Sequence, residues 1–118
     1  MKCFIKSYEN LREFIEYDLY YFNSTYHNYL NGYKTEQDFN NYNYAMTKML
    51  NVYASIFPEY YFKIVLNKTF NDFEIEVWRT KTIFKPAKMI DTIKQNCSTW
   101  NKITGAYSAP VLFMVCSF

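Results

Sequence analysis

Apolar side chains recur every three or four residues over the first part of the chain, which is the spacing of one face of an α-helix. Ser7 is a favourable N-cap, and Glu9 would lie in the positively polarised first turn. Asn31 and Gly32 end the pattern, because glycine readily adopts the left-handed conformation that a helix C-terminus favours. The sequence therefore predicts a helix over 8–30. Its apolar stripe comprises Leu11, Phe14, Ile15, Leu19, Phe22, Tyr26, Tyr29 and Leu30.

A second helix is predicted directly after the connection 31–35. Thr35 and Asp38 form a variant of the capping box, with aspartate where glutamate or glutamine is usual. Pro58 ends this helix, because proline disfavours the helical conformation of the residue before it. The short connection predicts an antiparallel pair of helices. The second apolar stripe comprises Phe39, Tyr42, Met46, Met49, Leu50, Tyr53, Ile56 and Phe57.

The period of the pattern changes after Pro58. Segments 60–66 and 73–78 are rich in aromatic and β-branched residues and alternate in polarity, which is typical of strands. Turn-prone residues over 67–72 would join them into a β-hairpin. Strands are also predicted at 2–6 and at 107–118, the last of them well covered because its apolar residues barely alternate.

A third helix is predicted over 86–105, because Pro86 favours a first helical turn and Gly105 favours an end. Its apolar face would comprise Ile90, Ile93, Cys97 and Trp100. The predicted order is β-α-α-β-β-α-β, which becomes the ferredoxin-like order when one helix is removed. We expect an α+β fold in a single domain over 1–118. In it, the αα-hairpin and the third helix pack on an antiparallel sheet of three or four strands.

Composition narrows the class of protein. The chain has 13 tyrosines and 11 phenylalanines among 118 residues, which is too much aromatic surface for a disordered segment. Its longest nearly apolar run, 109–116, is far shorter than the roughly 20 residues that cross a bilayer. No secretory leader is evident, so we expect a cytoplasmic protein without a membrane partner. With 2 glycines, neither GxGxxG nor a P-loop can be written.

Residues that could support catalysis are sparse. The 3 cysteines are widely spaced, which predicts reduced thiols and no disulfide framework. His27 is the only histidine, so a metal site or an activated nucleophile would depend on it. Glu74 and Glu76 would share one face of a strand, which is more typical of a solubilising face than of a catalytic pair. We expect no catalysis, no cofactor and no metal.

Basic residues concentrate in the second half of the chain. Residues 60–118 hold eight basic and four acidic side chains, against five and seven in residues 1–59. Basic side chains beside aromatic rings are typical of sites that bind single-stranded nucleic acid. A net charge of only +2 argues against this function, and a solvated helix face would explain the same pattern. The segment 78–102 is the alternative candidate site, comprising Trp78, Arg79, Lys81, Lys85, Lys88, Lys94 and Trp100.

Tyrosines outside the apolar stripes are the first candidate for function. We expect Tyr17, Tyr20, Tyr21 and Tyr44 on the outer face of the helical hairpin. Tyrosine is enriched at interfaces because its large ring costs little side-chain entropy. The chain favours residues with A+T-rich codons, so codon usage alone would also explain the surplus. We predict a protein-binding factor that masks its partner sterically. Concrete forms are a phage, virus or mobile-element inhibitor of a host defence protein, of the anti-CRISPR type for instance, or a homodimer.

Overall fold

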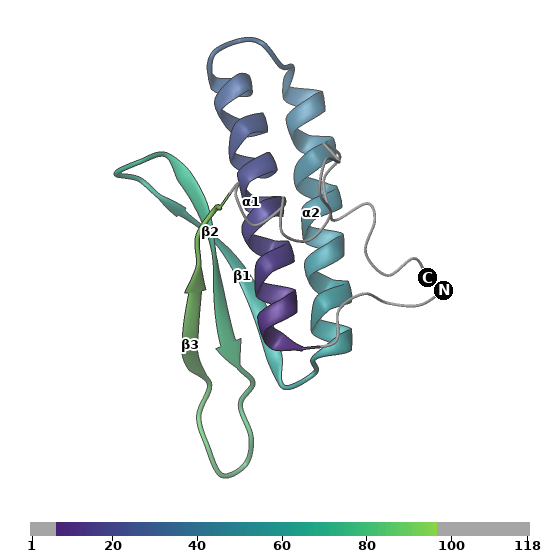
Figure 1. Cartoon of the computed structure of the whole chain (residues 1–118), viewed down its shortest axis with the longest axis vertical. Coiled ribbons are helices and arrows are strands. Elements are labelled where there is room, and N and C mark those ends of the chain that lie inside the picture. Colours follow the sequence, from purple (N-terminus) through teal and green to yellow (C-terminus); the bar gives the residue numbers. More distant parts are fainter. Residues whose placement is uncertain (1–6, 97–118) are drawn as a thin grey trace.

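The computed structural model describes residues 7–96 as two helices and a three-stranded antiparallel sheet (Figure 1). Helices α1 (Tyr8–Leu30) and α2 (Glu36–Ile56) lie side by side, and the sheet packs on one side of this pair. Strands β1 (Tyr60–Asn67), β2 (Asp72–Arg79) and β3 (Lys88–Ile93) follow one another across the sheet. The architecture is α+β, with one layer of helices and one of strands.

The predicted ends of both helices are confirmed. The Ser7 hydroxyl accepts a hydrogen bond from the backbone of Asn10 at 3.1 Å. Thr35 and Asp38 form a reciprocal capping box, in which each side chain accepts a bond from the backbone N–H of the other at 3.1 Å. Gly32 has a φ of 82°, a left-handed conformation that glycine adopts without strain. These local signals explain why the helices begin and end where the sequence predicts.

The predicted hairpin of β1 and β2 is also confirmed. Its register runs from Tyr60 opposite Arg79 to Asn67 opposite Asp72. Because side chains alternate between the two faces of a strand, one apolar set faces the helices. This set includes Phe62, Ile64, Phe73, Ile75 and Val77.

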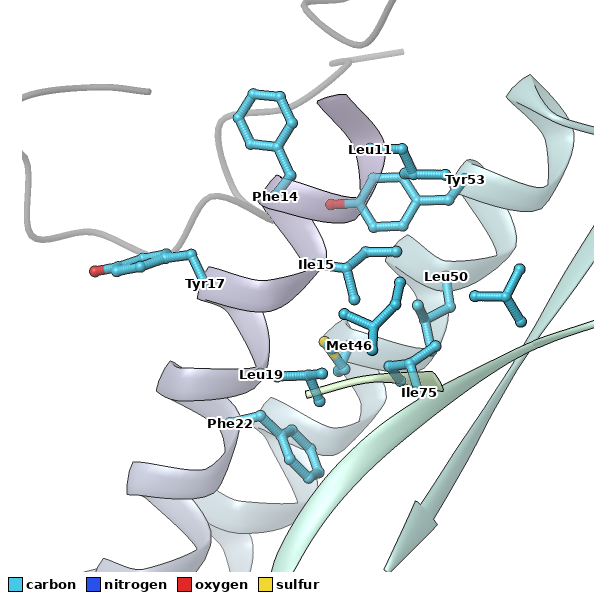
Figure 2. Close-up of a cluster of buried hydrophobic side chains, with 12 residues drawn as sticks. Leu11, Phe14, Ile15, Tyr17, Leu19, Phe22, Met46, Leu50, Tyr53 and Ile75 are labelled. Carbon is cyan, nitrogen blue, oxygen red and sulfur yellow. The ribbon is translucent and has the colours of Figure 1, made fainter. Parts of the chain in front are cut away.

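One hydrophobic core joins the helices to the sheet (Figure 2). Helix α1 is the central element, because it contacts α2, β2 and β3. The core is therefore built around the N-terminal two thirds of α1. Its buried members are Leu11, Phe14, Ile15, Tyr17, Leu19, Phe22, Met46, Leu50, Tyr53, Ile75, Val77 and Ile93.

The third helix predicted over 86–105 is wrong in its described part, where residues 88–93 form β3. This strand pairs with β2, and the register skips Ile90 at a bulge. Because of the bulge, the apolar residues of this strand do not alternate strictly along the sequence. The three-residue spacing of Ile90 and Ile93 therefore resembles that of a helix. Pairing with the edge of β2 gives hydrogen-bond partners to a row of backbone groups. These long-range contacts outweigh the weak local tendency of the segment to form a helix.

The predicted order β-α-α-β-β-α-β is replaced by α-α-β-β-β over residues 7–96. The strands predicted at 2–6 and 107–118 lie outside the described residues, as do Cys3, Cys97 and Cys116. Neither of the helices formed by residues 7–96 has an apolar stretch long enough to cross a membrane.

A side chain of α1 completes the hydrogen bonding of β2 beyond the end of β3. Asn23 is only 1% exposed; it donates to the Phe73 carbonyl at 3.0 Å and accepts from the Phe73 N–H at 2.6 Å. It also donates to Oε1 of Gln95 at 3.2 Å. The side-chain amide of Asn23 thus takes the position that another residue of β3 would occupy if the strand continued. Both backbone groups of Phe73 therefore have hydrogen-bond partners.

A charged cluster fixes β3 to α1. Oδ2 of Asp91 accepts hydrogen bonds from Nε of Arg12 at 2.9 Å and from the Tyr8 hydroxyl at 2.7 Å. Arg12 also pairs with Glu16 at 2.6 Å. Burial acts to raise the pKa of Asp91, but the hydrogen bonds from Arg12 and Tyr8 outweigh it and hold the pKa below its ordinary value.

We expect Asp91 to make the fold sensitive to acid. A carboxyl group whose pKa is lowered on folding stabilises the protein above its unfolded pKa of about 3.9, and this contribution is lost as the pH falls through the folded pKa. Asp91→Asn should therefore lower the free energy of unfolding at neutral pH. In urea titrations, the difference in free energy of unfolding between this variant and wild type should become smaller as the pH is lowered to about 3. The free energy of unfolding of Arg12→Gln should likewise approach that of wild type as the pH falls. A constant difference over this range would contradict the assignment.

Candidate binding surface

The structure divides the four tyrosines of the predicted patch. Tyr17 is only 4% exposed, so the surface position expected for it is wrong. Its ring packs on Tyr21 and Tyr20, with centroid distances of 5.1 and 6.2 Å. Figure 2 shows that Tyr17 leaves α1 on the side away from Leu50. Helix α1 is buried on more than one side, which an analysis based on a single apolar stripe does not anticipate.

Tyr20 and Tyr44 remain exposed, at 38% and 70%, and lie on different helices. At about 100° per residue, Tyr44 is rotated by about 200° from the buried Met46 and therefore faces away from the core. Within residues 7–96, no ring contact joins Tyr44 to the other three tyrosines. The predicted patch is thus reduced to two exposed rings, with Tyr21 half-buried between α1 neighbours.

The basic segment forms a protruding hairpin, which we call the arm (residues 79–88). Figure 1 shows that the loop between β2 and β3 extends away from the helices and forms one extremity of the molecule. Arg79 and Lys88 face each other at its base, and Lys81 and Lys85 are exposed in the loop. Trp78 directly precedes the arm. The structure therefore brings together five of the seven residues of the candidate nucleic-acid site.

The other two residues of that site are not part of the arm. Lys94 follows β3 at the opposite end of the strand, so about 20 Å of extended chain separates it from Lys88. There it lines a pocket together with Asp72 and Glu74. Trp100 lies outside the described residues.

Two apolar side chains form the tip of the arm. Ile83 and Phe84 are 92% and 87% exposed. The Thr82 hydroxyl accepts hydrogen bonds from the backbone N–H groups of Phe84 at 3.3 Å and Lys85 at 3.0 Å, and the Thr82 N–H donates to the Lys85 carbonyl at 2.9 Å. These bonds give the tip a defined shape. Ile83 is not among the residues predicted for this site, although an apolar pair between lysines and ahead of Pro86 is a visible signal in the sequence.

The arm is positively charged without compensation. No acidic residue occurs from Val77 to Ile90. The salt bridges within residues 7–96 join Arg12 to Glu16 and Asp91, and His27 to Asp72. The arm cations therefore have no carboxylate partner in the described part of the chain; they are Arg79, Lys81, Lys85 and Lys88. Unpaired cations along an arm with an apolar tip favour a negatively charged partner.

An aromatic pair lies at the base of the arm, on the face of the sheet that points away from the helices. Tyr61 and Trp78 stack across β1 and β2, with centroids 6.0 Å apart and rings inclined by 12°. The indole N–H of Trp78 donates to Glu76 at 3.0 Å. Glu74 accepts a bond from Asn67 at 3.1 Å. Both glutamates thus have hydrogen-bond partners on this face of the sheet.

His27 lies beside a pocket at the other end of the sheet. Its Nε2 is 2.9 Å from Oδ1 of Asp72, which lines this cavity of about 220 Å³. Among described residues, the lining has no hydroxyl or thiol that could act as a nucleophile, and no cluster of metal ligands occurs. The lining residues are Asn67, Phe70, Asp72, Phe73, Glu74, Lys94 and Gln95. Nothing in this geometry favours a particular reaction.

An acidic side chain is buried between the two helices. Asp18 is 0% exposed, and its Oδ2 accepts a hydrogen bond from the Tyr53 hydroxyl at 3.1 Å. Burial, and next the charge of Asp18, raise the pKa of Tyr53 and of Tyr42. These groups are enclosed by the core, so we assign them to stability and not to binding.

Comparison with known proteins gives no family for the chain. No family model, no curated protein and no solved structure matches it. The arm and the chemistry of its side chains are therefore the best indication of function.

Proposed function

We propose that the protein is a non-catalytic binding protein and that the arm is its contact surface. The exposure of Ile83 and Phe84, at 92% and 87%, is the observation that carries this proposal. Apolar side chains that project into water on a protruding element are typical of interaction sites, since burying them against a partner is favourable. The cations around them would orient the arm on an acidic partner and accelerate association.

A partner protein with an acidic groove and an apolar pocket would be masked sterically by the arm. With such a partner, the protein would be an inhibitor of a host defence protein, encoded by a phage, virus or mobile element, and A+T-rich codon usage supports such an origin. The exposed rings of Tyr20 and Tyr44 are a second candidate surface for the same role, or for a homodimer.

Site-specific photocrosslinking in cells of the native host tests which surface makes the contact. Benzoylphenylalanine would replace Phe84 in one full-length variant and Tyr44, an exposed ring on α2, in a matched control. We expect an adduct from position 84 and none from position 44. Ile83→Ser should lower the yield of the adduct at position 84, because it removes the other apolar residue of the tip.

The outcomes separate the two surfaces. An adduct from position 44 alone would place the contact on the helices, and equal adducts from both positions would contradict a specific contact by the arm. Digestion of the adduct with nuclease and with protease shows whether the crosslinked partner is nucleic acid or protein.

A further inference from the structure

We propose that the partner of the arm is duplex DNA, and that the arm enters a groove with Ile83 and Phe84 as an apolar wedge between base pairs. This inference rests on the proposed function, because it names the occupant of the same surface. It assigns the four cations to phosphates and the two tip residues to the base stack.

The charge of the arm complements that of duplex DNA. Arg79 and Lys81 precede the tip and Lys85 and Lys88 follow it, so cations lie on both sides of the projecting loop. No carboxylate of residues 7–96 pairs with any of them. Duplex DNA presents two rows of phosphates that flank each groove, which is the matching arrangement of negative charge. A protein partner would need an equally one-sided acidic groove built for this purpose.

The shape of the arm also suits a groove of the duplex. Beyond the strand pair of Arg79 and Lys88 the arm is a loop over 80–87, so only this loop would have to enter a groove. The major groove, about 12 Å wide, admits a whole two-stranded β-ribbon and so has room for the loop. The loop of the arm projects beyond the body of the molecule, so the helices do not prevent the tip from reaching the floor of a groove (Figure 1).

The two side chains at the tip have the chemistry of a DNA wedge. Phenylalanine and isoleucine are among the side chains that DNA-bending proteins insert between base steps, where they unstack the bases and kink the duplex. In this protein the two are adjacent, almost fully exposed and held by the hydrogen bonds of Thr82. A wedge needs this combination of exposure and fixed geometry.

The sheet face makes single-stranded nucleic acid the less favoured occupant. Bases could stack on Tyr61 and Trp78, but the carboxylate of Glu76 is bonded to the indole of Trp78, and Glu74 lies further along the same face. Lys63 lies opposite Glu76 on this face, so the face has no excess of positive charge to attract phosphates. The exposed apolar side chains and two of the cations, Lys81 and Lys85, are instead in the loop of the arm.

Fluorescence anisotropy with the full-length protein and a labelled duplex of about 20 base pairs tests the assignment of the cations. Four neutralised phosphates correspond to a slope of log affinity against log salt of about −3.6, so affinity should fall about 150-fold from 50 to 200 mM KCl. The triple change Lys81→Gln, Lys85→Gln and Lys88→Gln should reduce the slope to about −0.9. A control variant with the same net charge as the arm variant leaves the arm intact; it carries Lys48→Gln, Lys63→Gln and Lys94→Gln. Its slope should be nearly that of wild type.

The wedge is tested with 2-aminopurine at a central TA step of the same duplex, because its fluorescence rises when the base is unstacked. We expect a rise with wild-type protein. The double change Ile83→Ser and Phe84→Ser should abolish the rise and leave the salt slope unchanged, since the cations remain. Circular dichroism of each variant shows whether the fold is kept.

Several results would overturn the inference: no duplex binding at 50 mM KCl, tighter binding of the single strand, or equal loss in the two lysine variants. Binding to phosphatidylcholine vesicles with about 30% phosphatidylglycerol, but not to duplex, would assign the arm to a lipid surface instead. Binding without a fluorescence rise would refute the wedge. A protein adduct from position 84, without duplex binding, would refute DNA and keep the arm as the contact surface.

Discussion

Replacement of Phe22 by alanine should lower the free energy of unfolding by about 3–5 kcal/mol. Phe22 is 1% exposed and lies where α1, α2 and β2 meet. Its ring contacts Phe39, Tyr42 and Phe73, with centroid distances of 6.0, 5.6 and 4.8 Å. Removal of the ring leaves a cavity between α1, α2 and β2, and these elements cannot all move inward to fill it. This loss is a large part of the total free energy of unfolding, which is about 5–15 kcal/mol for native proteins.

Urea denaturation followed by circular dichroism measures this effect, and Phe70→Ala is the matched control. Phe70 is 70% exposed in the turn between β1 and β2, so its loss should change the free energy of unfolding by no more than about 0.5 kcal/mol. Similar effects of the two changes would contradict the position of Phe22 in the core.

Replacement of Asn23 by alanine should cost about 3 kcal/mol of stability, because two backbone groups of a partly buried strand would lose their partner. Asn23 bonds both the N–H and the carbonyl of Phe73, and alanine can do neither. Hydrogen exchange gives a local measurement, since the Phe73 amide should lose protection more than the amides paired between β1 and β2.

Asn28→Ala is the matched control for this change, because Asn28 is exposed on the same helix. It should leave stability unchanged or slightly raised, as alanine has the higher helix propensity. If Asn23→Ala left the exchange of the Phe73 amide unaltered, the proposed pairing of helix side chain and strand would be wrong.

Local signals explain which elements were predictable. The limits of α1 and α2 depend on caps within a few residues of each end, such as Ser7, Gly32 and the box of Thr35 and Asp38. The hairpin of β1 and β2 follows from alternation and from a short turn-prone link. The candidate site was found in part for the same reason, since a cluster of cations near aromatic residues is visible along the chain.

The remaining features depend on contacts between distant segments. Residues 88–93 became a strand because the edge of β2 needed hydrogen-bond partners, and the bulge at Ile90 disguised the alternation. Tyr17 is buried because α1 is central, and the apolar period describes only one face of a helix. The separation of Lys94 from the arm follows from the direction of β3, which no spacing rule contains.

The sequence by itself thus determined the two helices, the first hairpin and the excess of positive charge in the second half of the chain, because caps, periodicity and charge are local properties. Only the tertiary structure decided that this charge is carried on a projecting arm with Ile83 and Phe84 at its tip. Exposure depends on what the rest of the chain covers, and the helices cover one face of the sheet while leaving the arm in solvent.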